Sequence, residues 1–306
     1  MKAVVFGYQE IGYVCLEELV DFGVHVSHLF THEDDPDEEI WFHRPVTVAQ
    51  KHNIPVHTPT TVKDEKWIQL IEDAAPDFIF SFYYRSMIPK RVLDIPRVAA
   101  LNLHGSLLPK FRGRAPANWV LVEGESETGV TLHEMVEKPD AGDIIAQKKI
   151  EIAFEDDVYT LYMKMTGAAR QLMKETLPKL ADGSFIRTPQ TGASSYFGGR
   201  KPEDGLIRWQ KDALSLYNLT RAVTHPYPGA FTYLKGRKLF VWKADPKDGN
   251  GGGAPGKIVS SDPLMVSTGK GTLKLLRVQL EGEEEMDAGE FASLHGIDNE
   301  ILGGGA

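Results

Sequence analysis

Residues 98–109 read VAALNLHGSLLP, and this stretch decides how the rest of the chain is interpreted. Its first four residues are apolar, which predicts a short buried strand. Asn102 and His104 follow with one residue between them, so at a strand end both side chains point to the same face. Gly105 and Pro109 then favour a turn away from the sheet. The stretch therefore predicts an amide beside an imidazole at an open strand end, where α/β sheets bind ligands.

An amide donor beside an imidazole suits acyl transfer. The amide can stabilise an oxyanion, and the imidazole can move a proton. The alternative is an ordinary buried histidine that neighbouring groups satisfy. Ser106 lacks the G-x-S-x-G context of a nucleophilic serine, so we interpret it as a turn or wall residue.

Strand and helix patterns alternate on both sides of this stretch. Strands are predicted at residues 2–6, 24–30, 54–57, 77–84, 127–136 and 143–152. Helices are predicted at residues 11–19, 46–52, 64–74, 115–122 and 156–180. This alternation predicts an α/β fold with a Rossmann-like, doubly wound and mostly parallel sheet.

Turn-forming residues crowd together between residues 188 and 202. We therefore predict an N-terminal catalytic domain over 1–190, a linker over 191–203 and a C-terminal domain over 204–306. The last range contains a predicted helix and short strands, which indicate a small, mostly β module. Gly251–Gly256 satisfies G-x-G-x-x-G but carries Pro where a helix should begin. It is interpreted as a flexible loop, and no NAD site is expected.

Composition narrows the class of partner. The 306 residues include 43 acidic and 34 basic side chains, with a net charge of −9, which argues against nucleic acid or an anionic membrane as the main partner. Cys15 is the single cysteine, so no internal disulfide can form and a reducing compartment is indicated. No apolar run approaches the roughly 18–20 residues of a membrane helix, and no signal sequence precedes the first strand. We expect a cytoplasmic protein without membrane insertion and without a bound metal.

The motif Asn-x-His-x-Ser-Leu-Leu-Pro, with Asp140 further along the chain, resembles the folate-dependent formyltransferases. The longer run from Ser106 to Glu125 is similar to a narrower group, the formyltransferase domains of the bifunctional enzymes that make UDP-4-amino-4-deoxy-L-arabinose for lipid A modification. The resemblance implies 10-formyltetrahydrofolate as co-substrate and a C-terminal domain built as an OB-like β-barrel. The resemblance extends over the whole chain.

The resemblance implies catalytic roles for Asn102, His104 and Asp140. Asn102 would donate a hydrogen bond to the formyl oxygen as that oxygen gains charge. His104 would carry a proton from the attacking amine to the departing folate nitrogen. Asp140 would stabilise the charged imidazole and so raise its pKa. The folate carries the formyl group, so no protein nucleophile is required.

The resemblance also implies where the folate lies. The segment after the strand at 77–84 would line the pterin pocket, mostly through its main chain, although a plain loop is the alternative. The residues implied as folate contacts are Ser86, Met87, Ile88, Arg114, Val136, Glu137, Lys138, Pro139 and Asp140. Lys110 and Arg112 are candidates for contacts to a diphosphate, on charge and placement alone. The alternative for both is an exposed charge on a loop.

The implied function is formyl transfer from 10-formyltetrahydrofolate to the 4-amino group of UDP-4-amino-4-deoxy-L-arabinose, a step in lipid A modification and cationic peptide resistance. The same chemistry on another nucleotide-linked amino sugar or on methionyl-tRNA is an alternative. A folate- or nucleotide-binding protein without activity is another. His32–Glu39 carries six carboxylates, which would repel the phosphates of a tRNA. The sequence leaves open the exact acceptor, the oligomeric state, and whether the chain stands alone or is part of a bifunctional protein.

Overall fold

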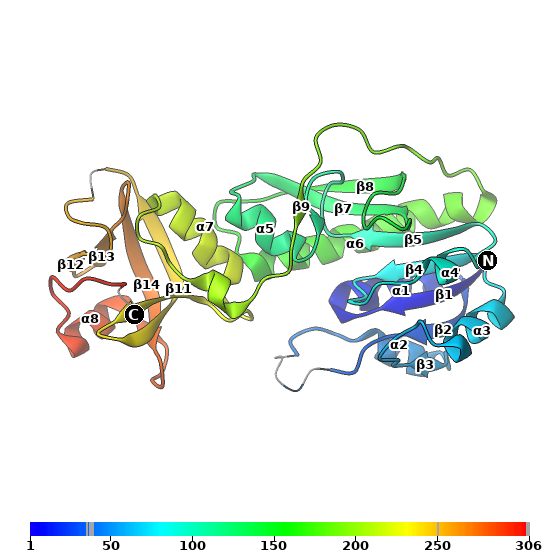
Figure 1. Cartoon of the computed structure of the whole chain (residues 1–306), viewed down its shortest axis with the longest axis horizontal. Helices are drawn as coiled ribbons and strands as arrows, with labels where there is room; N and C mark the ends of the chain where they lie inside the picture. Colours follow the sequence, from blue (N-terminus) through cyan, green and yellow to red (C-terminus); the bar gives the residue numbers. More distant parts are fainter. Residues whose placement is uncertain (35, 37–39, 250, 304–306) are drawn as a thin grey trace. The chain divides into compact units, whose positions relative to one another are not determined.

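The computed structural model describes residues 1–34, 36, 40–249 and 251–303. It divides into two compact units (Figure 1). The first consists of Met1–Pro116, Glu127–Glu151 and Tyr162–Phe197, and the second of Ala117–Ser126, Ile152–Leu161 and Gly198–Ala306. The chain thus passes to the second unit between residues 197 and 198, and two earlier segments also belong to that unit. The domain ranges 1–190 and 204–306 stay a prediction.

The first unit is built on a seven-stranded sheet with the order β3-β2-β1-β4-β5-β7-β8. Its strands are β1 (Lys2–Gly7), β2 (His25–Phe30), β3 (Val56–His57), β4 (Phe78–Phe82), β5 (Ala99–His104), β7 (Glu127–Glu134) and β8 (Ile144–Glu151). The pairs from β3 to β5 are parallel, whereas β7 and β8 are antiparallel. The predicted α/β fold with a mostly parallel sheet is therefore confirmed.

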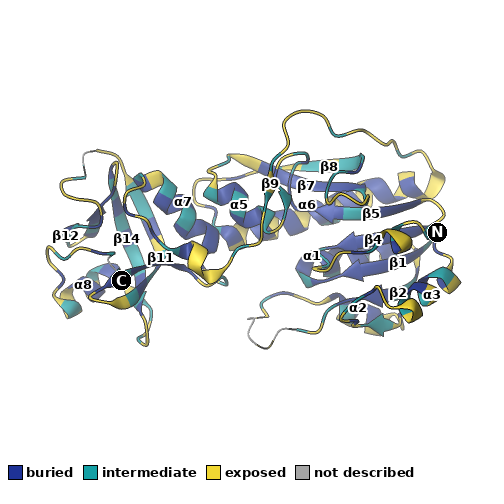
Figure 2. Ribbon diagram, viewed as in Figure 1, coloured by how far each residue is buried: buried dark blue, intermediate teal, exposed yellow. Residues whose placement is uncertain are grey.

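Helices cover the sheet because its central strands are apolar on both faces. Figure 2 draws these strands dark blue because their residues are buried. The helices that belong mainly to this unit are α1 (Gln9–Asp21), α2 (Pro45–Lys51), α3 (Glu65–Ala74), α4 (Lys90–Leu93) and α6 (Val158–Asp182). Helices α3 and α4 pack on one face of the sheet. Ile71 and Val92 of these helices belong to one apolar cluster with strand residues that point to that face. Helix α1 is tied to α6 by Arg170, which donates to the carboxylates of Glu17 and Glu18.

Alternation along β5 positions two polar side chains. Ala100, Asn102 and His104 share one face of this strand. Ala100 belongs to the apolar cluster beneath α3 and α4. Asn102 and His104 continue the same face beyond Ala100, towards the carboxyl end of the strand, where the turn beginning at Gly105 follows. The sheet therefore carries an amide and an imidazole directly next to a rigid apolar core.

A short pairing lies outside this sheet. Strand β6 (Arg112–Gly113) pairs in parallel with β9 (Tyr196–Phe197). The turn Gly105–Phe111 leads into β6, and Ser106 holds it, because its buried hydroxyl donates to the Lys110 carbonyl oxygen at 2.7 Å. This contact agrees with the interpretation of Ser106 as a turn residue.

The second unit contains an antiparallel sheet with the order β10-β11-β14-β13-β12, to which β15 adds by pairing with β14. Its strands are β10 (Ala230–Leu234), β11 (Arg237–Lys247), β12 (Ile258–Ser261), β13 (Leu264–Ser267), β14 (Thr272–Leu280) and β15 (Met286–Asp287). Its helical segments are α5 (Pro116–Val122), η1 (Pro202–Gly205), α7 (Ala213–Val223) and α8 (Ala288–His295). A separate, mostly β domain in the C-terminal part is confirmed, while closure into an OB-like barrel stays a prediction.

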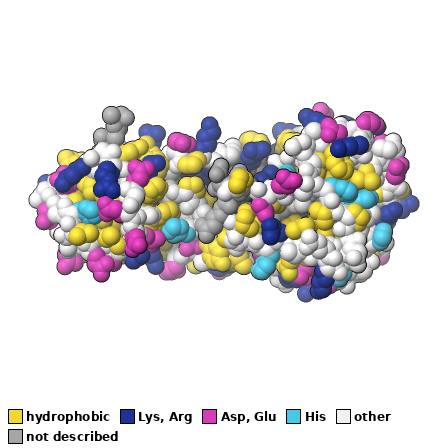
Figure 3. All heavy atoms as spheres, turned by 90° about the horizontal axis from the view of Figure 1, so that it is seen from below, with side chains coloured by type: hydrophobic (Ala, Val, Ile, Leu, Met, Phe, Trp, Pro, Cys, Tyr) yellow, Lys and Arg dark blue, Asp and Glu magenta, His cyan; other side chains and the backbone are white. Residues whose placement is uncertain are grey.

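Charged side chains of both signs are interspersed over the face of the molecule drawn in Figure 3. In the described part of the chain, no helix combines the length and the apolar character needed to span a membrane.

Candidate active site

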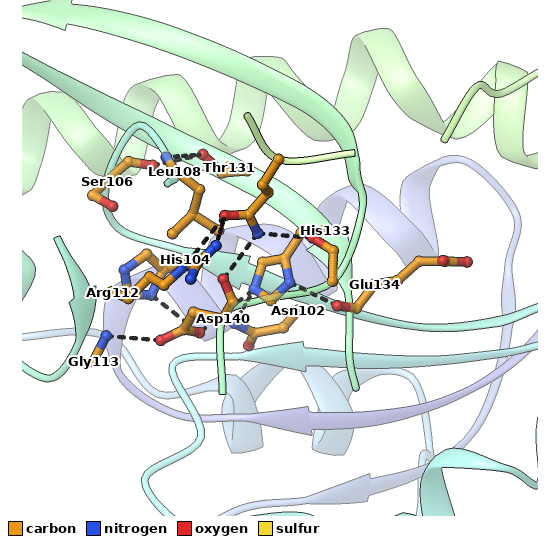
Figure 4. Close-up of polar contacts among 12 residues, drawn as sticks. Asn102, His104, Ser106, Leu108, Arg112, Gly113, Thr131, His133, Glu134 and Asp140 are labelled. Atoms are coloured by element: carbon orange, nitrogen blue, oxygen red, sulfur yellow. Dashed lines mark hydrogen bonds and ion pairs between the residues drawn. The ribbon is translucent and has the colours of Figure 1, made fainter. Parts of the chain in front are cut away.

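Asn102 faces a histidine on the neighbouring strand. In the antiparallel register of β5 and β7, Asn102 lies opposite His133, and its Nδ2 is 3.1 Å from His133 Nε2 (Figure 4). His133 Nδ1 lies 2.8 Å from the carbonyl oxygen of Glu134. A carbonyl can only accept, so Nδ1 carries a proton, and in this tautomer Nε2 accepts from the amide. His133 thereby fixes which end of the Asn102 amide points towards it.

His104 is buried, and its two ring nitrogens have different partners. Nε2 donates to the carbonyl oxygen of Phe111 at 2.7 Å. Nδ1 lies 3.5 Å from Oδ1 of Asp140. The Phe111 contact occupies Nε2 as a donor, so Nδ1 is the nitrogen that can gain or lose a proton.

Asp140 connects three parts of the site. Its Oδ2 accepts from the backbone N–H of Gly113 at 2.8 Å, and its Oδ1 lies 3.6 Å from His133 Nε2 as well as 3.5 Å from His104. Burial raises the pKa of this carboxyl, but the neighbouring imidazoles of His133 and His104 and the hydrogen bond from the Gly113 N–H together hold the pKa at about 2. Asp140 is therefore ionised at neutral pH.

The pKa of His104 lies below its ordinary value, because burial disfavours the charged ring more than Asp140 favours it. We predicted that Asp140 raises this pKa. The carboxylate does act in that direction, but the net shift of the pKa is downward because a fully buried ring loses more hydration than one carboxylate replaces. His104 is consequently neutral at pH 7, which is the form that accepts a proton.

The structure thus brings Asn102, His104 and Asp140 together, as Figure 4 shows. His133 was missed from the sequence. His133 lies on β7, and apolar periodicity does not give the antiparallel register that places this strand against β5. Gln190 was also missed: its side chain donates to the carbonyl oxygens of Asp140 and Gly142.

The segment implied as a pterin pocket follows β4. Ile88 is buried in the cluster beneath α3 and α4, and Met135, the residue after β7, packs against the same cluster. This shared core brings the segment after β4 close to the loop that ends at Asp140. Ser86 is exposed, as are Met87 at 60% and Val136 at 44%. Exposed apolar side chains on two neighbouring loops fit a site that the flat face of an aromatic ring would cover.

The other residues of that loop and the three basic candidates differ in how far their side chains are exposed. Glu137, Lys138 and Pro139 are all exposed. Arg114 is exposed, and its backbone N–H donates to the Phe197 carbonyl oxygen.

Lys110 is exposed on the turn before β6. Arg112 is half-buried, and its guanidinium donates to Oε1 of Gln190 at 2.7 Å. Within the described residues no carboxylate pairs with Arg112, so its charge is held by a neutral amide and remains available to an anion.

No group of three or more His, Cys, Asp or Glu side chains among the described residues could hold a metal ion. His28 and His32 do have the spacing His-x₃-His, but they have separate partners. His28 Nδ1 lies 3.0 Å from His57 Nε2, and His32 Nε2 accepts from the backbone N–H of Arg85.

Comparison with known proteins gives the following matches. The formyl transferase family matches residues 2–177, and the formyl transferase C-terminal domain matches residues 200–296. A solved structure of WlaRD, a sugar 3N-formyl transferase in the presence of dTDP and 5-N-formyl-THF, is similar with a TM-score of 0.69 at 18% identity, covering 93% of this chain and 99% of that one. An N-formyltransferase from Helicobacter canadensis, in complex with folinic acid and dTDP-3-aminofucose, has a TM-score of 0.68 at 18% identity, covering 94% and 100%.

A third similar structure is HypX from Aquifex aeolicus in complex with tetrahydrofolic acid. It has a TM-score of 0.63 at 19% identity, with 98% of this chain and 48% of that chain covered. This chain therefore spans about half the length of HypX. At these identities the similarity to the three structures concerns the fold.

Proposed function

The chain belongs to the formyl transferase family, and from this premise we propose that it transfers the formyl group of 10-formyltetrahydrofolate to the 4-amino group of UDP-4-amino-4-deoxy-L-arabinose. The observation that carries the proposal is the convergence of Asn102, His104 and Asp140 on one face of the sheet. An amide donor, a neutral buried imidazole and an ionised carboxylate are the groups that formyl transfer to an amine requires.

The reaction forms one carbon–nitrogen bond and breaks another. The acceptor nitrogen bonds to the formyl carbon, the bond from that carbon to the folate nitrogen breaks, and one proton moves from the acceptor nitrogen to the departing nitrogen. Asn102 donates to the formyl oxygen, where negative charge develops. Neutral His104 takes the amine proton at Nδ1, returns it to the departing nitrogen and ends unchanged.

Asp140 stabilises the imidazolium that exists between the two proton transfers. Its Oδ1 lies 3.5 Å from His104 Nδ1, the nitrogen that receives the proton. The acceptor must be an unprotonated amine, because an ammonium has no lone pair with which to attack. The folate supplies the formyl group, so all remaining work of the chain is orientation, proton transfer and charge stabilisation.

We place the folate between the segment after β4 and the loop that ends at Asp140. The proposed contacts are Ser86, Met87, Ile88, Arg114, Val136, Glu137, Lys138, Pro139 and Asp140. The exposed apolar surface of Met87 and Val136, on loops that share one apolar cluster, supports this placement. We propose Lys110 and Arg112 as contacts to the diphosphate of the acceptor, supported by the unpaired charge of Arg112 in the described structure.

Structural similarity and sequence similarity both support the proposed acceptor. One similar structure is a sugar 3N-formyl transferase, and another is an N-formyltransferase in complex with dTDP-3-aminofucose, which favours a nucleotide-linked amino sugar here. The uridine nucleotide and the 4-amino-arabinose are proposed on the run from Ser106 to Glu125. The proposal places the reaction in the cytoplasm, as a step of lipid A modification and cationic peptide resistance.

Methionyl-tRNA is the runner-up acceptor. The mixed charges over the face drawn in Figure 3 and the six carboxylates of His32–Glu39 disfavour a polyanion. Asp35 and Asp37–Glu39 lie outside the described residues.

An acceptor panel tests the proposal. The kcat/KM of formyl transfer is measured with UDP-4-amino-4-deoxy-L-arabinose, a dTDP-linked 4-amino sugar, a dTDP-linked 3-amino sugar and initiator methionyl-tRNA. We expect the highest value with the UDP sugar and no formylation of the tRNA. A higher kcat/KM with a dTDP sugar would replace the acceptor, and formylation of the tRNA alone would overturn the sugar assignment.

A further inference from the structure

The segment from Thr188 to Phe197 lies against both loops that build the site. At one end, Thr188 and Ile144 exchange two backbone hydrogen bonds, which ties the segment to the start of β8. At the other end, the Ser195 hydroxyl accepts from the backbone N–H of Phe111 at 2.8 Å, and β9 pairs with β6. Most of this segment lies in the range predicted as a linker, yet it is anchored at both ends to the first unit.

Gln190 lies between these anchors, and its side-chain amide joins the two loops. Nε2 donates to the carbonyl oxygen of Asp140 at 2.8 Å and to that of Gly142 at 2.7 Å. Oε1 accepts from Nη2 of Arg112 at 2.7 Å. Both amide hydrogens and the amide oxygen are therefore used, and they connect the loop before β8 with strand β6.

These contacts require an amide. The two carbonyl oxygens need a donor, and the guanidinium of Arg112 needs an acceptor. A glutamate at position 190 would accept hydrogen bonds from Arg112. Its carboxylate has no hydrogen to donate, so it would repel both carbonyl oxygens. A methionine would fill a similar volume without making any of the three hydrogen bonds.

The backbone of Asp140 needs such support. Asp140 has a φ of +54°, in the left-handed region that a non-glycine residue occupies only when its surroundings hold it there. Its carboxylate is fixed at one oxygen by the Gly113 N–H and faces His104 Nδ1 with the other. A shift of this backbone would change the separation between the carboxylate and the imidazole.

We propose that Gln190 is a positioning residue for formyl transfer: it holds the Asp140 loop and Arg112 in one arrangement, so that the carboxylate stays beside His104 while the guanidinium faces the acceptor. This inference rests on the proposed function. Gln190 touches neither the reacting atoms nor the ring of His104; it acts through the Asp140 backbone.

The test uses the full chain with Gln190→Met and Gln190→Glu, and Gln171→Met as the matched control. Gln171 is an exposed glutamine whose amide donates to Glu175 within α6. For each variant, kcat and KM are measured for both substrates across pH, and the pKa of His104 is followed by NMR without substrates. Thermal melting reports folding.

For Gln190→Met we expect kcat to fall about 10²-fold, the effect of displacing a positioned group by about 1 Å. The His104 pKa should fall as the carboxylate moves away, and Gln190→Glu should show the fall in kcat. Gln171→Met should match the wild type. A merely structural role would lower the melting temperature but leave the His104 pKa and the pH profile unchanged.

The inference and the proposed function fail in different ways. A wild-type protein without formyl transfer removes the proposed function. An active wild type together with a Gln190→Met variant of unchanged kcat and unchanged His104 pKa overturns the role of Gln190 alone. If Gln190→Glu does not fold, the neutral Gln190→Met variant decides the question.

Discussion

Replacing Asp140 by Asn removes the charge beside His104 while keeping nearly the same shape. In the wild type the Asp140 pKa is about 2, so the carboxylate is charged at every pH at which the enzyme is assayed. Its Oδ1 lies 3.5 Å from the nitrogen that takes up the proton. Asp140→Asn should therefore destabilise the imidazolium more than it affects the neutral ring.

The size of this effect follows from the distance. Two unit charges 3.5 Å apart attract by about 5 kcal/mol at an effective dielectric constant of ~20. Each charge is shared between two atoms, so the effective separation is larger and we expect about half of this energy. At about 1.4 kcal/mol for each factor of ten, kcat should fall roughly 10²-fold.

The pH dependence of the activity tests the role of Asp140 independently. His104 acts in its neutral form, so activity falls as pH drops through its pKa. That pKa already lies below the ordinary value because of burial. Asp140 raises it, so Asp140→Asn should lower the pKa further and move the acid limb to lower pH, away from the ordinary value near ~6.5.

The assay is initial-rate formyl transfer at saturating substrates over a range of pH, with Asp143→Asn from the same loop as control. We expect the control to keep the wild-type rate and acid limb. An Asp140→Asn variant with wild-type kcat and an unmoved acid limb would refute the electrostatic role. An acid limb that moves to higher pH would contradict the stabilisation of the His104 imidazolium by Asp140.

Three further substitutions distinguish residues that act in catalysis from a residue that stabilises the fold. Asn102→Ala should lower kcat by ~10²–10³-fold, as expected for the loss of an oxyanion donor, with binding of a folate analogue unchanged by calorimetry. His133→Ala should lower kcat by about tenfold, because the Asn102 amide loses the acceptor that orients it; equal kcat would show that the amide needs no such partner. Gly113→Ala should destabilise the protein by roughly 2 kcal/mol or more in urea denaturation, since Gly113 has a φ of +100° and a Cβ there would lie 2.1 Å from the Phe197 carbonyl oxygen. Gly183→Ala, with a φ of +78° and open space around its Cβ, is the control for strain without a clash.

Local sequence patterns predicted the parts of the site that depend on local geometry. The apolar run before Asn102 predicted strand β5, and a strand's period of two places Asn102 and His104 on one face. The alternation of strands and helices predicted the parallel part of the sheet. The role of Asp140 was implied only by family resemblance, because its approach to His104 depends on a loop with a left-handed residue.

Other features depend on packing and on register, which periodicity does not specify. The sign of the His104 pKa shift is set by full burial of the ring, and one strand's pattern cannot predict how deeply its end is covered. His133 meets Asn102 only through the antiparallel register of β5 and β7. Gln190 is distant in sequence from both loops that it joins, and its surroundings look like a linker by composition.

The most direct test of the central claim measures tetrahydrofolate released from 10-formyltetrahydrofolate together with the formylated product. The comparison is between the wild type and His104→Ala, each with and without UDP-4-amino-4-deoxy-L-arabinose. We predict that the wild type releases folate only when the amino sugar is present, with one formylated sugar for each folate, and that His104→Ala releases none under the same conditions. Release that does not depend on the acceptor, or equal rates in the two proteins, would contradict formyl transfer at this site.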